Sequence, residues 1–246
     1  EAIRNGQITS RALLEHLIER IERINPALNA VVTVDYESAR AAADAADAAL
    51  ARGDTPGPLH GVPITIKDAL ETRGIRSTGG AAELCDNVPV HDAPVVRAVR
   101  DAGAIILGKT NLPRWSGDLQ SFNDLFGTTV NPWNPDRVPG GSSGGAAAAV
   151  AAGLSSFEIG TDIGGSIRIP SAYCGVFGHK PSFGIVPSSG YLDHERGGTT
   201  EADINVIGPI ARSAGDLELL LGILLRKDGP LVAELAPPPE DLRTLR

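Results

Sequence analysis

The most constraining feature of this sequence is a strand, helix, strand pattern in its first half. Residues 62–66 alternate and are rich in branched side chains, as in a buried strand, and Lys67 follows them directly. Residues 93–102 have a helical pattern, residues 104–107 read as the next strand, and the polar segment 108–111 comes after it. Such alternation predicts an α/β fold with its chemistry at the carboxyl ends of the strands.

The flanking segments fit the same class. Residues 9–25 predict an amphipathic helix that Thr9 or Ser10 caps and Pro26 ends, followed by a strand at 31–34 and a helix at 37–51. Further elements are predicted as a small-residue helix at 146–153, a strand at 154–159 and a helix at 214–225 that Ser213 caps. We expect a mixed, mostly parallel central β-sheet covered by helices on both faces, incomplete at its C-terminal end.

Composition sets the broad class. The chain has 246 residues, 42% of them hydrophobic and 21% charged, and its net charge of -8 comes without a basic stripe. We therefore expect no nucleic-acid partner. No apolar run reaches the ~18 residues of a membrane span, and only two cysteines occur, Cys85 and Cys174, which indicates a reducing, cytoplasmic location.

The domain organisation is predicted as one domain over residues 1–246. Within it, helices occupy the N-terminal segment 9–52 and a catalytic core occupies 61–225, whereas 226–246 begins a linker toward a missing second half. The first residue is Glu1 rather than Met, so we interpret the chain as a fragment of a longer protein.

Two serines framed by glycines are the strongest chemical signal. The block Gly140-Gly141-Ser142-Ser143-Gly144-Gly145 is followed by a second block, Gly160-Thr161-Asp162-Ile163-Gly164-Gly165-Ser166. Glycine lets backbone N–H groups approach a reacting oxygen closely, and it holds a serine exposed in a tight turn. The alternative is a flexible linker, but the first block runs straight into an alanine helix and the second follows a strand.

A reactive serine needs a base, and none of the five histidines is a good candidate. They lie on a helix, in loops or in polar surroundings, and a surface or satisfied histidine explains each of them: His16, His60, His91, His179 and His194. A lysine that burial keeps neutral can do the same work. Lys67 is the candidate, against the alternative of an edge lysine that reaches water.

These segments together resemble the amidase-signature family of serine amidohydrolases. The resemblance rests on Gly61–Asp68, on the first glycine-framed block and on Gly160–Pro170. It extends through Asn131-Pro132-Trp133 and Cys174–Pro181 to Gly208–Arg212, and so covers nearly the whole chain. Family catalytic domains are typically much longer than this chain, and His179 stands where many relatives have an apolar residue.

The resemblance implies a catalytic triad. Ser166 would be the nucleophile, Ser142, after a cis peptide bond, the bridging serine, and Lys67 the base. The backbone N–H groups that would hold the oxyanion belong to Ile163, Gly164, Gly165 and Ser166. Ser143 and Asp162 would orient the hydroxyls, Arg168 would either anchor their loop or touch substrate, and the proline-rich segment 112–139 would supply the substrate-binding residues Trp115, Ser116 and Asp118.

The implied activity is hydrolysis of a small-molecule carboxamide through an acyl-enzyme, without metal or cofactor. One alternative is a glutamine-dependent amidotransferase subunit, and another is a non-catalytic or truncated fragment. A third is an α/β-hydrolase-type esterase, since Gly140-x-Ser142-x-Gly144 fits a nucleophile elbow. Its acid would be Asp162 or Asp193, and its base would be His179 or His194. However, residues 131–139 do not read as the strand that an elbow needs. The sequence leaves the oligomeric state open, a homodimer included.

Overall fold

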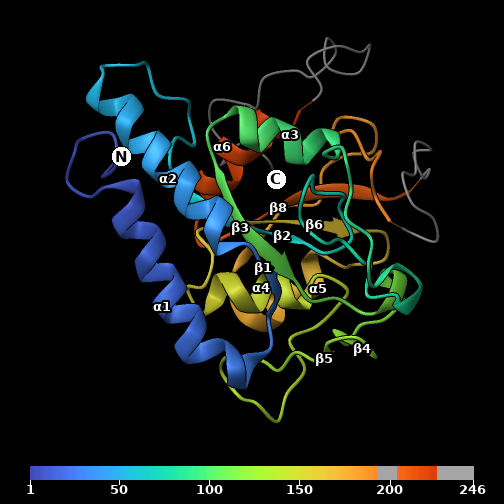
Figure 1. Cartoon of the computed structure of the whole chain (residues 1–246). Coiled ribbons are helices and arrows are strands. Elements are labelled where there is room, and N and C mark those ends of the chain that lie inside the picture. Colours follow the sequence, from blue (N-terminus) through green and yellow to red (C-terminus); the bar gives the residue numbers. More distant parts are fainter. Residues whose placement is uncertain (193–203, 226–246) are drawn as a thin grey trace, which may run out of the picture.

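The computed structural model describes residues 1–192 and 204–225. Two long helices, α1 (Ser10–Leu28) and α2 (Tyr36–Ala51), pack against each other beside the first sheet (Figure 1). The Thr9 side chain accepts from the N–H of Ala12 and caps α1, as predicted. The prediction that Pro26 ends this helix is wrong, because α1 continues to Leu28 and closes on a left-handed Asn29.

Three strands form the first sheet, in the order β1 (Val31–Val34), β3 (Ile105–Thr110) and β2 (Pro63–Lys67). The strands β2 and β3 are parallel, with α3 (Pro94–Asp101) in the connection between them, while β1 is antiparallel to β3. The strand, helix, strand prediction is therefore confirmed. The strand β3 runs further than predicted, so that Lys109 and Thr110 lie inside it and are fully buried.

A second sheet is wholly antiparallel. Its order is β6 (Glu158–Asp162), β8 (Val206–Ala211) and β7 (Phe177–Gly178), and its strand β6 lies against β2 of the first sheet. A two-strand hairpin of β4 (Phe122–Asn123) and β5 (Gly127–Thr128) stands apart. The prediction of an α/β fold holds, but a mostly parallel central sheet is wrong, because strand direction depends on connections that local periodicity does not reveal.

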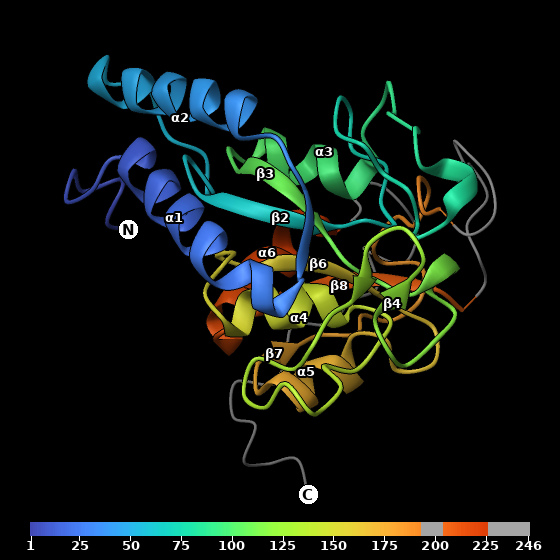
Figure 2. The ribbon, with the colours of Figure 1, turned by 60° about the horizontal axis from the view of Figure 1, so that its bottom comes forward.

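The helices α3 and α4 lie on opposite sides of β2 and β3 (Figure 2). Helices and strands together form two hydrophobic clusters. One cluster holds apolar residues of α3, β2 and α6 (Ala214–Leu224), the helix that Ser213 caps as predicted. The other holds residues of α1, α2 and α4 (Gly144–Ala151). All residues from Gly144 to Val150 are buried, so α4 is packed against other elements on every side. Small residues, mostly glycine and alanine, allow these neighbours to approach the helix closely.

Some elements were not anticipated. The helix α5 (Arg168–Cys174) begins two residues after Ser166, and two short 3₁₀ turns occur at Ala82–Leu84 and Arg114–Ser116. The strand β6 begins at Glu158, not at Leu154 as predicted. The predicted linker 226–246, with Pro237–Pro239, lies outside the described residues. In the part of the chain that is described, no helix has the length and apolar character to cross a membrane.

Candidate active site

The lysine at the end of β2 lies in the core. Its side chain is fully buried, and its Nζ donates to Ser142 Oγ at 2.7 Å, Thr161 Oγ1 at 2.7 Å and Ser143 Oγ at 3.1 Å. Burial lowers the pKa of Lys67 to about 7, and the negative charges of Glu158 and Asp162 oppose that shift. Near neutral pH this amine can therefore accept a proton, which an exposed lysine cannot do.

The first serine block is packed so tightly that its glycines have no substitute. The peptide bond between Gly141 and Ser142 is cis, the geometry that the resemblance implied. A Cβ on Gly141 would lie 2.6 Å from the carbonyl oxygen of Asp118, and one on Gly145 would lie 2.5 Å from backbone atoms of Asn111. These contacts fix the backbone on both sides of Ser142 and direct its hydroxyl toward Lys67.

Ser143 joins the two serine blocks. Its Oγ accepts from Lys67 and from the N–H of Thr161 at 3.3 Å, and it donates to the carbonyl oxygen of Thr161 at 3.2 Å. Its own N–H donates to the carbonyl oxygen of Ser166 at 3.1 Å. The three predicted catalytic residues are thus brought to one place, with Ser166 connected through its backbone.

Asp162 holds the loop that carries Ser166. Its carboxylate accepts from the N–H groups of Gly165 at 2.8 Å and Ile167 at 3.0 Å, and from the Arg168 guanidinium at 2.8 and 3.0 Å. Burial acts to raise the pKa of Asp162, but Arg168 and the backbone donors outweigh it and bring the pKa to about 2. Arg168 is therefore an anchor of this loop.

The backbone beside Ser166 is open on one side. Ser166 itself is 9% exposed, Ile163 is 49% exposed, and a Cβ on Gly164 would meet nothing within 4 Å. Among the described residues none accepts from the N–H groups of Ile163, Gly164 and Ser166. The N–H of Gly165 is different, because it already donates to Asp162. Three of the four predicted oxyanion donors are thus free to meet a substrate oxygen.

The predicted substrate segment borders the same site. Trp115 and Ser116 have left-handed backbones with φ of 54° and 56°, which is rare outside glycine. The N–H of Trp115 donates to the carbonyl oxygen of Gly79 at 2.8 Å. The Asp118 carboxylate accepts from the N–H of Leu119 at 2.6 Å and stabilises its own turn, while its backbone carbonyl packs on Gly141. The Asp118 carboxylate and the Ser116 hydroxyl make no hydrogen bond to Ser142 or Ser166.

Sequence reasoning missed Thr161, which completes the hydrogen bonding of the lysine. It also missed two buried polar side chains nearby, Glu158 and Lys109. Thr161 lies on β6 five residues before Ser166, so a polar residue in a strand that leads into the nucleophile loop was the available signal.

The esterase alternative finds no support in the geometry. Residues 131–143 contain no strand, so the sharp strand-to-helix elbow is absent at Ser142. Of the histidines that the structure describes, none bonds to Ser142 or Ser166; His60 contacts the carbonyl oxygen of Ala46, and the N–H of His179 donates to that of Pro209. Asp193 and His194 lie outside the described residues. In the described ranges, no group of three or more His, Cys, Asp or Glu side chains could hold a metal ion.

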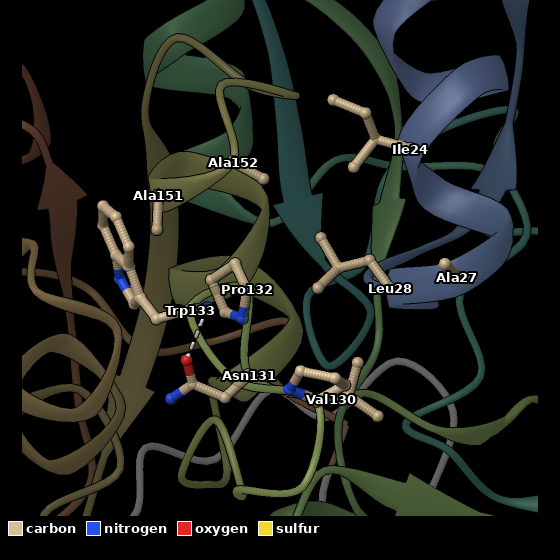
Figure 3. A pocket seen from close by; sticks show the side chains of 10 residues that line it. Ile24, Ala27, Leu28, Val130, Asn131, Pro132, Trp133, Ala151 and Ala152 are labelled. Atoms are coloured by element: carbon tan, nitrogen blue, oxygen red, sulfur yellow. Dashed lines mark hydrogen bonds between the residues drawn. The ribbon is translucent and has the colours of Figure 1, made fainter.

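An apolar pocket of about 380 Å³ lies elsewhere, between α1, the C-terminal end of α4 and the segment around Trp133 (Figure 3). Ile24 and Leu28 line it from α1, and Ala151 and Ala152 line it from the end of α4. None of the candidate catalytic, oxyanion or substrate-binding residues contributes to it. The conjunction of lysine and serines, rather than this pocket, defines the candidate active site.

Comparison with known proteins agrees with this geometry. Residues 12–245 match the family described as Amidase, and the chain belongs to that family. It is 44% identical over 228 residues to one subunit of the glutamyl-tRNA(Gln) amidotransferase of Roseiflexus sp. (strain RS-1), covering 93% of this chain and 45% of that protein. The corresponding subunit of Halorhodospira halophila (strain DSM 244 / SL1) is 46% identical over 221 residues, which cover 90% of this chain and 44% of that protein.

Solved structures show the same fold. A bacterial aryl acylamidase of the amidase-signature family superposes with a TM-score of 0.84 at 35% identity, covering 92% of this chain and 46% of that one. The peptide amidase of Stenotrophomonas maltophilia gives a TM-score of 0.84 at 34% identity, covering 96% of this chain and 49% of that one. The chain therefore spans about half the length of the relatives it matches.

Proposed function

We propose that this chain carries the acyl-transfer centre of an enzyme that hydrolyses carboxamides. The observation that carries the proposal is the fully buried Lys67, whose amine has a pKa near 7 and lies 2.7 Å from the hydroxyl oxygen of Ser142, so that the neutral amine can accept the proton of that hydroxyl. A neutral amine on a relay of hydroxyls is suited to activate a serine, since Ser-Lys pairs use the same logic as a serine-histidine pair.

The reaction proceeds in two halves. Ser142 passes its proton to Lys67 and takes the proton of Ser166, whose Oγ forms a bond to the amide carbonyl carbon. The oxyanion is stabilised by the N–H groups of Ile163, Gly164 and Ser166. The N–H of Gly165 can add a fourth hydrogen bond only when it no longer donates to the Asp162 carboxylate. The carbon–nitrogen bond then breaks, and the relay returns a proton to the leaving amine or ammonia. Water next attacks the acyl ester, which frees the carboxylic acid and restores Ser166.

Substrate recognition is proposed for the segment that contains Trp115, Ser116 and Asp118. The hydroxyl of Ser116 and the amide oxygen of Gln120 are buried, and neither has a hydrogen-bond partner in the described part of the chain. Native structures rarely leave such atoms without a partner. Polar atoms of a bound amide are suited to supply the missing hydrogen bonds, and the proximity of this segment to Gly141 supports that placement.

The test is covalent labelling by a fluorophosphonate, with the modified peptide mapped by mass spectrometry. We expect label on Ser166 that Ser166→Ala and Lys67→Ala abolish, while Ser38→Ala, an exposed serine on α2, leaves labelling unchanged. Label on Ser142 would instead favour an elbow nucleophile. Absence of label on a folded chain, and on a longer chain as well, would refute the proposed acyl transfer.

A second candidate function is that of an amidotransferase subunit that releases ammonia from glutamine. It is favoured by the identity of 41–46% to proteins named as subunits of glutamyl-tRNA(Gln) amidotransferase. A panel of glutamine and aryl, alkyl and peptide amides separates the two functions. Release of ammonia from glutamine that depends on companion proteins would support the second, whereas hydrolysis of simple amides by this protein alone would support the first.

A further inference from the structure

Glu158 is a buried acid that the proposed reaction does not use. Its side chain is fully buried at the start of β6. One carboxylate oxygen accepts from the hydroxyl of Thr110 at 2.7 Å, and the other accepts from the N–H of Ile159 at 2.8 Å. No cation of the described residues forms a salt bridge with it. Burying an ionised acid costs stability unless a cation or hydrogen bonds compensate for the lost hydration, and here only hydrogen bonds do.

The strands place this carboxyl group next to the catalytic lysine. Thr110, which holds Glu158, is the residue opposite Lys67 in the pairing of β2 with β3. The strand β6 lies against β2, and its residue Thr161 bonds to Lys67 Nζ. Lys67 and Glu158 are therefore connected both through β3 and along β6.

Lys67 has no charged hydrogen-bond partner of its own among the described residues. Its three acceptors, Ser142, Ser143 and Thr161, are neutral hydroxyls. Protonation of Lys67 thus depends on negative charge at longer range, and the two acids that act on it are Glu158 and Asp162.

These two acids differ in what surrounds them. Arg168 forms an ion pair with Asp162 and offsets its charge. Glu158 has no such ion pair, although the positive charge of Lys109 acts on it at longer range. The amine of Lys109 donates instead to the carbonyl oxygen of Leu70 and to the hydroxyls of Thr72 and Ser77. Burial raises the pKa of Glu158 to about 7, so its charge changes in the same range of pH as that of Lys67.

We propose that Glu158 is a positioning residue that acts through Lys67, placing a buried negative charge that sets the pH at which the lysine becomes free to accept a proton. This role rests on the proposed function of Lys67 as the base. Ionised Glu158 favours the protonated lysine, and so it tunes the base without touching the substrate.

The experiment is a pH titration of the lysines by NMR, with ¹³C at the ε carbon. The chain has only four lysines, so Lys67 is assigned by the signal that disappears in Lys67→Met. We expect the titration midpoint of Lys67 to fall by about one pH unit in Glu158→Gln, which is a tenfold loss of proton affinity. The pH profile of Ser166 labelling should move by the same amount in the same direction.

Two further variants keep the outcome clear. Asp68→Asn removes a buried carboxyl that faces Lys109, and we expect it to leave the midpoint of Lys67 in place. Thr110→Val removes the hydroxyl that stabilises ionised Glu158, so it should lower the midpoint of Lys67 even if Glu158→Gln does not fold. The change is nearly isosteric.

An unchanged midpoint of Lys67 in folded Glu158→Gln or Thr110→Val would overturn the role of Glu158. The NMR readout does not depend on turnover, so the two proposals fail separately. A midpoint that moves in a protein whose Ser166 is never labelled would support the coupling and refute the acyl transfer.

Discussion

Replacement of Lys67 by methionine tests whether the core holds this amine uncharged. Methionine has a similar length and no charge, so it removes the buried amine while keeping most of the packing. The three hydroxyls within hydrogen-bond distance of Nζ lose their partner. The variant therefore separates the cost of burying a charge from the gain of three hydrogen bonds.

The size of the effect follows from the pKa, which is 10.5 for an ordinary lysine and about 7 here. Between these values the unfolded chain holds a proton on Lys67 that the folded chain has lost, so the free energy of unfolding rises with pH. The rise amounts to about 5 kcal/mol over the whole interval between the two pKa values. Three hydrogen bonds at about 1 kcal/mol each act in the opposite sense.

Near pH 7 we therefore expect Lys67→Met to be more stable than the natural chain by about 2 kcal/mol. By pH 10, close to the pKa of 10.5 of the unfolded chain, releasing the proton costs only about 1 kcal/mol, so the hydrogen bonds outweigh it and the order should reverse. Urea unfolding, followed by tryptophan fluorescence at several pH values, measures the difference in free energy of unfolding between the variant and the natural chain. Lys180→Met controls for the loss of a positive charge. A difference between the variant and the natural chain that stays constant from pH 7 to 10 would refute the reasoning.

Three other predictions follow from the site. The rate of fluorophosphonate labelling at Ser166 should rise with pH around a midpoint near 7, because Lys67 must lose its proton to act as base. A labelling rate that does not change from acid to alkaline pH would contradict the role of Lys67. Asp162→Ala should lower the free energy of unfolding in urea by about 3 kcal/mol, because several buried donors lose their acceptor. Arg168→Met should lower it by only about 1 kcal/mol, since the Arg168 side chain is 54% exposed. Equal losses in the two variants would contradict the anchoring role of Asp162. Gly145→Ala should lower stability by about 2 kcal/mol through its clash with Asn111, and an unchanged thermal midpoint would show that the contact can relax.

The candidate catalytic residues could be predicted because their signals are local. Glycine-framed turns and a lysine directly after an apolar strand are visible within a few residues, and the structure brings Lys67, Ser142 and Ser143 into hydrogen-bond contact. Their catalytic roles stay predictions. Glu158 and Lys109 were not predicted, because a charged residue in a strand resembles an exposed one until partners from other strands are known.

The errors in the fold have the same origin. Pro26 lies in the last turn of α1, and its fixed φ is compatible with the two residues of helix that follow. The strand β8, the middle strand of the second sheet, was not predicted; it contains Pro209, and proline is unusual in such a strand. The place of β8 in the sheet is decided by tertiary contacts that no sequence window contains.

Lys67 lies where the two hydrophobic clusters meet. Its strand contributes Ile64 and Ile66 to one cluster, and helix α4, which starts just after the serines, belongs to the other. Water that enters through either cluster would solvate the amine and return its pKa toward that of a surface lysine. Local opening is therefore expected to protonate the proposed base before the chain unfolds, and the labelling rate of Ser166 would then report how completely the interior is closed.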